Sequence, residues 1–112
     1  MGTKTMIIKK LFQLLFFLNL CIFTNAFAEV AAPPKQLKNN NCLACHSITT
    51  KIVGPAFKDV AAKYKSDPNA MTKIITNIKN GGKGNWGEIP MPPQPQINDA
   101  DLKTISQWVL KQ

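Results

Sequence analysis

Apolar residues recur at helical spacing in three separate stretches of the chain. Within each stretch they stand three or four positions apart, which places them on one face of an α-helix. The spacing therefore predicts three amphipathic helices, over residues 57–64, 69–80 and from 98 to the end, and no alternating pattern indicates a β-strand. The residues that form these faces are Phe57, Val60, Ala61, Tyr64, Met71, Ile74, Ile75, Ile78, Leu102, Ile105, Trp108 and Val109.

Capping residues mark where these helices begin and end. Asn98 is a candidate N-cap for the last helix, with Asp99 and Asp101 near its positive end. Gly81 is available for the left-handed position that ends the middle helix. Residues 81–97, rich in glycine and proline, are expected to form a loop.

A fourth helix is expected at the start of the folded part, over residues 35–45, with Leu37 and Leu43 turned inward. The run Asn39-Asn40-Asn41 is unfavourable within a helix and makes its boundary uncertain. The last helix is expected to pack across this first one. Residues 47–55 are expected to form a loop, with Gly54-Pro55 as a turn signal. The pattern as a whole predicts an all-α fold of about four short helices.

The N-terminal segment, residues 1–28, has the pattern of a secretory signal peptide rather than of a folded segment. Lys4, Lys9 and Lys10 precede an apolar run from Leu11 to Phe23, and Ala26-Phe27-Ala28 fits the A-x-A cleavage rule. An uncleaved anchor is the alternative, but about 13 residues are short for a membrane span. We therefore predict a cleaved signal peptide over 1–28, a single domain over 29–112, a periplasmic location and no membrane span after cleavage.

The charge of the predicted mature chain is positive and comes from lysine alone. The signal segment takes three of the 14 basic residues, which leaves eleven lysines against six acidic residues, a balance of +5. Nucleic-acid binding would favour arginine and base-stacking aromatic residues, whereas these lysines are dispersed. The charge favours either steering towards an acidic protein partner or a plain solvated surface, and no nucleic-acid partner is expected.

Cys42-Leu43-Ala44-Cys45-His46 is the C-x-x-C-H pattern for covalent haem attachment. Two thiols one helical turn apart can each bond one vinyl group of a porphyrin, and the next residue brings an imidazole to the iron. A structural zinc site needs four ligands, and outside the signal segment these are the only cysteines and the only histidine. A thioredoxin-like pair would need a βαβ context, whereas a simple disulfide between Cys42 and Cys45 stays open.

A domain as short as 29–112 buries little core and usually needs a covalent or metal-based support. A covalently held haem would supply it, and the form without haem is expected to fold poorly. Met91 stands in the loop as Pro90-Met91-Pro92-Pro93. Prolines fix the backbone there, so Met91 is a candidate second axial ligand; filling a gap in the core is its alternative role.

The predicted mature sequence resembles the small bacterial class I cytochromes c of the cytochrome c-551 type, over nearly all of residues 29–112. The resemblance rests on four stretches: Cys42-Leu43-Ala44-Cys45-His46, Val53-Gly54-Pro55-Ala56-Phe57, Trp86-Gly87-Glu88-Ile89-Pro90-Met91-Pro92-Pro93, and Asp99-Ala100-Asp101-Leu102 leading to Trp108-Val109-Leu110. It implies a class I cytochrome c fold, in which about four short helices surround one haem c bound through Cys42 and Cys45.

The resemblance also implies a role for each matching residue. His46 and Met91 would be the axial ligands, the carbonyl of Pro55 would accept a hydrogen bond from the second nitrogen of His46, and the Trp86 indole would donate to a haem propionate. A core tryptophan is the plainer role for Trp86.

Two further positions bear on the haem surroundings. Gln94 stands where the family often has an amide near the methionine sulfur. Asn77 departs from the family, which often has arginine or histidine there, close to a propionate. This departure puts in doubt any pH dependence of the potential carried over from relatives.

The implied function is one-electron transfer and not enzymatic catalysis. The chain would be a monomer that shuttles electrons between transient respiratory partners, and a terminal oxidase or a nitrite reductase is implied only by the resemblance. The alternative is a haem-based sensor or peroxidase-like protein in which Met91 is displaced by a small molecule. A non-haem redox or metal protein is a third class.

Overall fold

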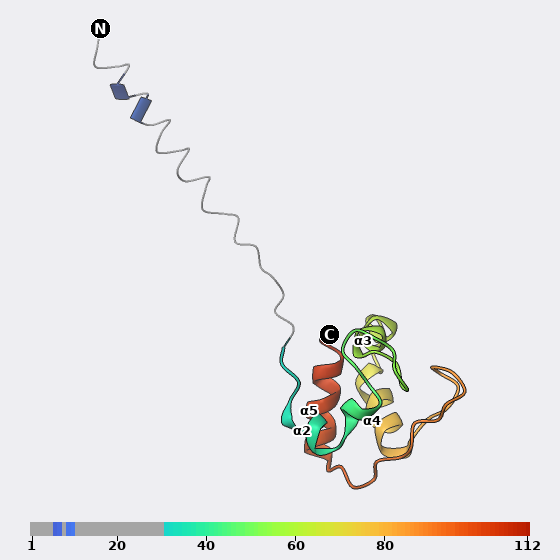
Figure 1. The fold of residues 1–112 in the computed structure, drawn as a ribbon. Coiled ribbons are helices and arrows are strands. Elements are labelled where there is room, and N and C mark those ends of the chain that lie inside the picture. The colour runs from blue at the N-terminus through green and yellow to red at the C-terminus, as the bar shows by residue number, and fades with distance from the viewer. Residues whose placement is uncertain (1–5, 8, 11–30) are drawn as a thin grey trace.

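The computed structural model describes residues 6–7, 9–10 and 31–112. The predicted cleavage point after Ala28 lies outside the described residues, as does most of the predicted signal peptide. Between residues 31 and 112 the regular structure is helical, with four α-helices, one 3-10 helix and no strand (Figure 1). In chain order these are α2 (Lys35–Asn39), η1 (Cys42–Ala44), α3 (Phe57–Tyr64), α4 (Ala70–Asn80) and α5 (Asp99–Val109).

The three helices predicted from apolar spacing are confirmed. The whole predicted face of α3 is buried, and so is that of α5. On α4 only Ile74 and Ile78 of the predicted residues are fully buried, because Met71 and Ile75 lie at the edge of the core. The side chain of Asn98 accepts a hydrogen bond from the Asp101 amide at 2.9 Å, as expected of an N-cap. Gly81 ends α4 with a positive φ of 73°, but its ψ of 176° lies outside the left-handed helical region that was expected.

The prediction of one continuous helix over residues 35–45 is wrong. Helix α2 ends at Asn39, and η1 begins three residues later at Cys42. Between them Asn41 takes a left-handed conformation, with φ 54° and ψ 25°, which no α-helix can continue through. Because the chain changes direction there, Leu37 is fully buried as predicted, whereas Leu43 is 36% exposed and does not face the core.

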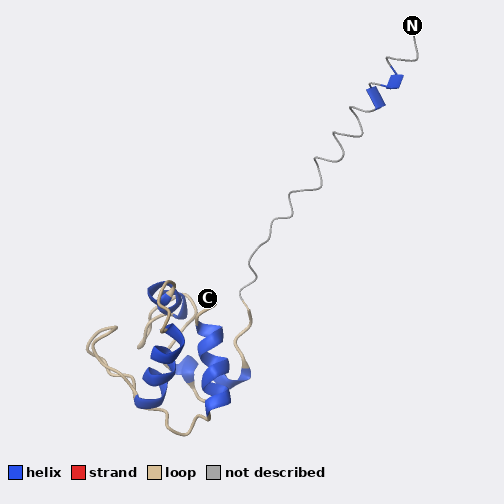
Figure 2. Ribbon diagram, turned by 180° about the vertical axis from the view of Figure 1, so that it is seen from behind, coloured by secondary structure: helices blue, strands red, loops and turns tan. Residues whose placement is uncertain are grey.

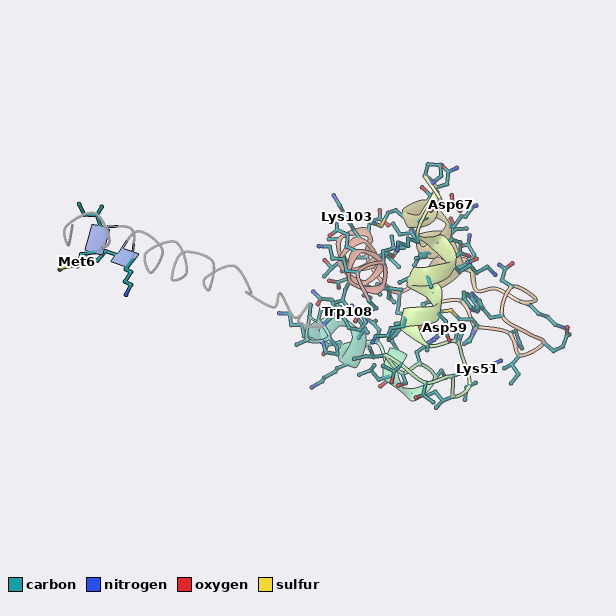
Figure 3. The ribbon with its side chains drawn as sticks, turned by 90° about the horizontal axis from the view of Figure 1, so that it is seen from above. Met6, Lys51, Asp59, Asp67, Lys103 and Trp108 are labelled. Carbon is teal, nitrogen blue, oxygen red and sulfur yellow. The ribbon has the colours of Figure 1, made fainter. Side chains whose placement is uncertain are left out.

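Helix α5 organises the fold, since it contacts α2, α3 and α4. Its Trp108 lies where α5 meets the segment that begins at residue 31 (Figure 3). The indole Nε1 of Trp108 donates to the carbonyl of Ala31 at 2.8 Å. The expected packing of the last helix across the first is therefore confirmed. Residues 47–55 and 81–97 form the two long irregular connections, drawn as tan loops in Figure 2. None of the helices described is long and apolar enough to cross a membrane.

Ser106→Ala is expected to stabilise the protein by about 1 kcal/mol. The Ser106 side chain on α5 is fully buried, and its Oγ has no hydrogen-bond partner among the described residues. An unsatisfied buried hydroxyl carries a desolvation cost of about 1–3 kcal/mol, and alanine also has the higher helix propensity.

Chemical unfolding of the two proteins measures this difference. Thr104→Ala is the control for helix propensity, because the Thr104 hydroxyl is paired with the Ala100 carbonyl at 3.0 Å. A gain no larger for Ser106→Ala than for Thr104→Ala would contradict the prediction.

Candidate functional site

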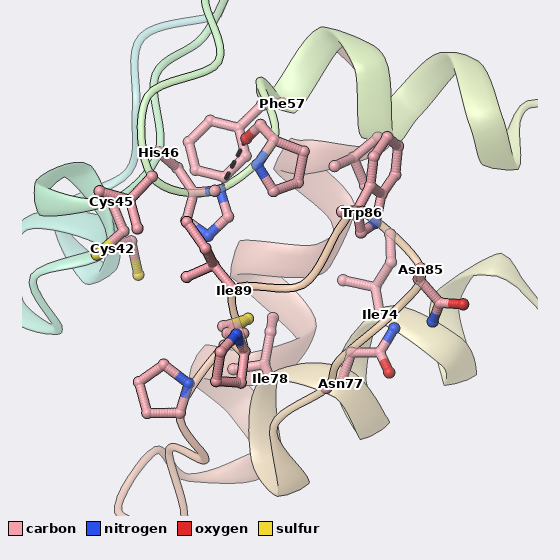
Figure 4. Close-up of a pocket in the computed structure, with 18 of the residues that line it drawn as sticks. Cys42, Cys45, His46, Phe57, Ile74, Asn77, Ile78, Asn85, Trp86 and Ile89 are labelled. Carbon is pink, nitrogen blue, oxygen red and sulfur yellow. Dashed lines mark hydrogen bonds between the residues drawn. The ribbon is translucent and has the colours of Figure 1, made fainter.

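A cavity of about 400 Å³ lies between the helices and the two long loops (Figure 4). All the residues predicted for the haem site line it, namely Cys42, Cys45, His46, Pro55, Trp86 and Met91. The rest of the wall is largely apolar and comes from the core faces of α3, α4 and α5, with Phe57, Val60, Ile74, Ile78, Ile105 and Val109. Its size is in the range of cofactor sites, about 300–1,000 Å³.

The two cysteines are brought to the edge of this cavity by η1. The turn is closed by the His46 amide, which donates to the Cys42 carbonyl at 3.0 Å. Both thiols are free, so the structure has no disulfide between them. Burial raises the pKa of the Cys42 thiol above its usual value, and the neighbouring Cys45 adds to the rise.

The imidazole of His46 is oriented by one hydrogen bond. Its Nδ1 lies 2.8 Å from the carbonyl oxygen of Pro55, drawn as a dashed line in Figure 4. A carbonyl only accepts, so Nδ1 carries the proton and a neutral His46 presents an unprotonated Nε2. Such a bond fixes both the tautomer and the plane of a metal-ligating histidine. His46 is thus prepared to bind a metal through Nε2.

Two further contacts hold the ring of His46, and neither was predicted from the sequence. Phe57, the first residue of α3, stacks on it with ring centroids 5.2 Å apart and planes inclined by 19°. On another side the ring lies against Gly54, where an added Cβ would stand 2.4 Å from His46 Cε1. Gly54-Pro55 indicated a turn, and the stretch from Val53 to Phe57 matched the family pattern, but neither signal indicated that Gly54 and Phe57 contact the His46 ring.

Met91 is held by its backbone as well as by the prolines around it. The Met91 amide donates to the Gly82 carbonyl at 2.8 Å, and the Gly82 amide donates back to the Met91 carbonyl at 3.1 Å. This pair is an isolated antiparallel bridge. Gly81 makes the close approach possible, since a Cβ there would stand 2.6 Å from the Met91 carbonyl oxygen. The bridge fixes Met91 next to the end of α4.

Asn77 and Gln94, the two amide positions singled out in the sequence, both lie in the cavity wall. Asn77 lines the cavity, and Figure 4 shows it beside Asn85 on the side away from Cys42. Gln94 also lines it; its amide nitrogen lies 3.4 Å from the Pro92 carbonyl, and its side-chain oxygen accepts from Gln96 at 2.8 Å.

These donor groups fit a haem bound through two thioethers. Two free thiols, a neutral imidazole nitrogen and a thioether sulfur border one apolar cavity, and these are the groups that attach and ligate a c-type haem. Cys42 and Cys45 would hold the porphyrin, and the apolar walls would cover its faces. No second histidine exists in the chain to offer a different ligand set.

Comparison with known proteins identifies the family of this chain. The family model "Cytochrome c" matches residues 31–112. Cytochrome c-552 of Nitrosomonas europaea is 52% identical over 73 residues, which are 65% of this chain and 71% of that protein. Cytochrome c-551 of Pseudomonas aeruginosa is 49% identical over 80 residues, which are 71% of this chain and 76% of that protein.

The fold has a counterpart among solved structures. The crystal structure of wild-type Nitrosomonas europaea cytochrome c552 matches with a TM-score of 0.66 and 50% sequence identity, covering 68% of this chain and 94% of that one. The expected class I cytochrome c fold is confirmed by this match. The chain therefore belongs to the cytochrome c family, and its cofactor is a haem c bound covalently through Cys42 and Cys45.

Proposed function

We propose that this small haem-containing electron carrier works in the periplasm, with His46 and Met91 as the two axial ligands of its iron. The observation that carries the proposal is that both side chains line one cavity, while the Pro55 carbonyl occupies His46 Nδ1 and leaves Nε2 to face a metal. The bridge between Gly82 and Met91 supports the assignment of the second ligand. Met71, on α4, is absent from the cavity wall.

The haem iron, when bound, supplies the chemistry by gaining or losing one electron. The residues around the haem would restrict its iron to this electron transfer. Two protein ligands, His46 and Met91, would leave no open coordination position for a substrate, and the walls from α3, α4 and α5 would surround the haem with largely apolar side chains. A methionine ligand and an apolar pocket both raise the reduction potential.

Trp86 and Asn77 are proposed to lie next to the propionates at the polar edge of the haem. Both line the cavity, and Trp86 is half-buried in a stretch of loop that is otherwise exposed. An indole N–H is a donor only, so it would be satisfied by a propionate oxygen. Asn77 adds a neutral amide where a cation would otherwise stabilise the propionate charge.

Electron exchange is proposed to take place where the cavity opens to the surface. Ile52, Val53 and Ile89 expose 51%, 48% and 66% of their surface, and Val53 and Ile89 also line the cavity. Lys51 and Lys83 stand beside them on the same wall. An apolar centre with lysines around it suits brief contacts with acidic redox partners, to which the charge steers association.

Export is proposed on the sequence of the N-terminal segment, residues 1–28. Mass spectrometry of the protein from a host that attaches c-type haem tests it. A mass equal to residues 29–112 plus one haem is expected. A mass that still includes the N-terminal segment would contradict cleavage and favour the anchored alternative.

Met91→Leu is expected to abolish the weak long-wavelength band that methionine ligation gives to the oxidised protein. Leucine keeps the size and apolar character of the side chain but has no sulfur to bind iron, so the sixth position opens. Optical spectra of the oxidised and reduced forms, recorded before and after denaturing extraction, measure ligation and covalent attachment separately.

Met71→Leu is the matched control, because it makes the same change outside the cavity. Haem that stays with the wild-type chain but shows no such band would contradict Met91 ligation. In that case, binding of carbon monoxide by the resting reduced protein would favour the sensor or peroxidase-like alternative. A wild-type chain without any haem would contradict the whole proposal.

A further inference from the structure

The loop that carries Met91 forms a narrow ribbon over residues 82–91, here called the Met91 ribbon. It projects from the helical body beyond α4, and is drawn in orange in Figure 1. Its base is the bridge between Gly82 and Met91, and inside it the Gly84 amide donates to the Gly87 carbonyl at 3.0 Å. Residues 83–90 are exposed except for Trp86, which is half-buried. Apart from Trp86 and Met91, which pack against the hydrophobic core, the ribbon has little packing to hold it against the body.

One side chain of the helical body, that of Lys63, contacts the outer part of this ribbon. Lys63, on α3, donates from Nζ to the Asn85 carbonyl at 2.9 Å. The same ammonium stands 4.4 Å from the centroid of the Trp86 ring, within the range of a cation–π interaction. Within the described residues this is the only hydrogen bond that joins residues 83–90 to the rest of the chain. Lys51, which is labelled in Figure 3, also lies close to the ribbon at Gly87.

We propose that Lys63 is a positioning residue for the haem site, which holds the Met91 ribbon closed and so keeps Met91 and Trp86 in place. The inference rests on the proposed function, in which Met91 is the sixth ligand. For an external ligand to reach that position, the Met91 sulfur must leave and the ribbon must move with it. A contact that forms only when the ribbon is closed stabilises the closed form. The free energy of that contact sets the factor by which the population of the open form falls.

The size of the effect follows from the exposure of the contact. Lys63 is exposed, and water weakens both the cation–π contact and the charge-assisted hydrogen bond at an exposed site. Loss of both is therefore expected to raise the open population by about threefold to tenfold, with tenfold equal to about 1.4 kcal/mol. The Gly82–Met91 bridge is untouched by this change, so the resting ligation persists.

Imidazole binding to the oxidised, haem-loaded protein is the test. Imidazole exchanges with the Met91 sulfur on the ferric iron, so an Fe–S bond breaks, an Fe–N bond forms and no electron is transferred. Lys63→Met keeps the apolar stem and removes the ammonium, and is expected to tighten imidazole binding about threefold to tenfold. Lys63→Arg is expected to stay close to wild type, because a guanidinium both donates and stacks on an aromatic ring.

Lys58→Met is the matched control. Lys58 is exposed on the same helix and lies outside the cavity wall, so the substitution makes the same change of charge without touching the ribbon. Hydrogen exchange of the Trp86 indole N–H gives a second readout, since opening of the ribbon would move this half-buried ring away from the cavity wall. Faster exchange is expected in Lys63→Met and not in Lys58→Met.

Two results overturn the inference, and they can be told apart. If the wild-type protein has the methionine band but Lys63→Met and Lys58→Met bind imidazole equally, Lys63 has no positioning role and the proposed ligation stands. If the wild-type protein lacks the band, Met91 is not the sixth ligand, and the proposed ligation fails together with the inference.

Discussion

Replacing Cys42 and Cys45 together by alanine is expected to give a chain that neither retains haem through denaturing extraction nor folds cooperatively. The reason is the cavity of about 400 Å³, whose walls include Phe57, Ile74, Ile78 and Ile105 of the hydrophobic core. An empty cavity of that size would cost on the order of 10 kcal/mol, at about 24 cal/mol per Å³. Small domains have a total stability of about 5–15 kcal/mol, so the core would not survive unfilled.

The experiment compares wild type, the double variant and Cys45→Ala, all produced in a host competent to attach haem. Acidic extraction measures covalent attachment, and near-ultraviolet circular dichroism with thermal unfolding measures tertiary structure. Cys45→Ala keeps one thioether position and is the matched intermediate, expected to retain haem and to unfold at a lower temperature. A double variant that unfolds cooperatively without haem would show that the helices pack without the cofactor.

Gly54→Ala is expected to lower the free energy of unfolding by about 3 kcal/mol, the upper end of the range for overpacking a core. The added Cβ would lie 2.4 Å from Cε1 and 2.8 Å from Nδ1 of His46. The ring cannot retreat freely, because Phe57 stacks on it and the Pro55 carbonyl accepts its Nδ1 proton. The substitution must therefore displace the imidazole and weaken that hydrogen bond.

NMR of the reduced protein follows the Nδ1 proton of His46, which a strong hydrogen bond protects from exchange with water. Loss of this protection is expected in Gly54→Ala together with the loss of stability. Gly84→Ala is the control, because a Cβ there meets nothing within 4 Å although its φ of 89° makes alanine unfavourable. Gly84→Ala is expected to cost about 1 kcal/mol and to leave the His46 proton protected. A protected proton in Gly54→Ala would contradict the role of Gly54.

Periodic spacing predicted the helices well where local preference and burial agree. Helices α3, α4 and α5 form over the predicted residues, with small differences at their ends, because their apolar faces repeat at helical spacing and Asn98 caps the last one. The first helix failed at Asn41, where an asparagine in the left-handed region turned the chain. Asparagine tolerates this conformation better than most residues, but the sequence does not state which of three adjacent asparagines will adopt it.

The residues of the candidate site were also predicted only in part. The cysteines and His46 carry their chemistry in a local pattern, and Met91 was predicted as a ligand from its prolines and from the resemblance. The structure places Met91 in the wall of the same cavity. The contacts that orient these side chains join separate segments of the chain. These contacts depend on how the loops lie over the helices. They pair Gly54 with His46, Gly82 with Met91 and Lys63 with Trp86. No spacing within the sequence encodes such contacts, and glycine and lysine are common enough to give no signal.

The hydrogen bond from Trp108 to Ala31 also bears on the order in which the molecule assembles. It joins residues 77 positions apart, and α2 likewise packs on α5 near the other end of the domain. Contacts between distant parts of a chain form late, because the loop between them must be closed first. If the chain is exported as proposed and emerges from its N-terminus, α2 can pack on α5 only after α5 has crossed the membrane. Until that moment Cys42 and Cys45 would remain on an open chain, where both thiols are accessible for the attachment of haem.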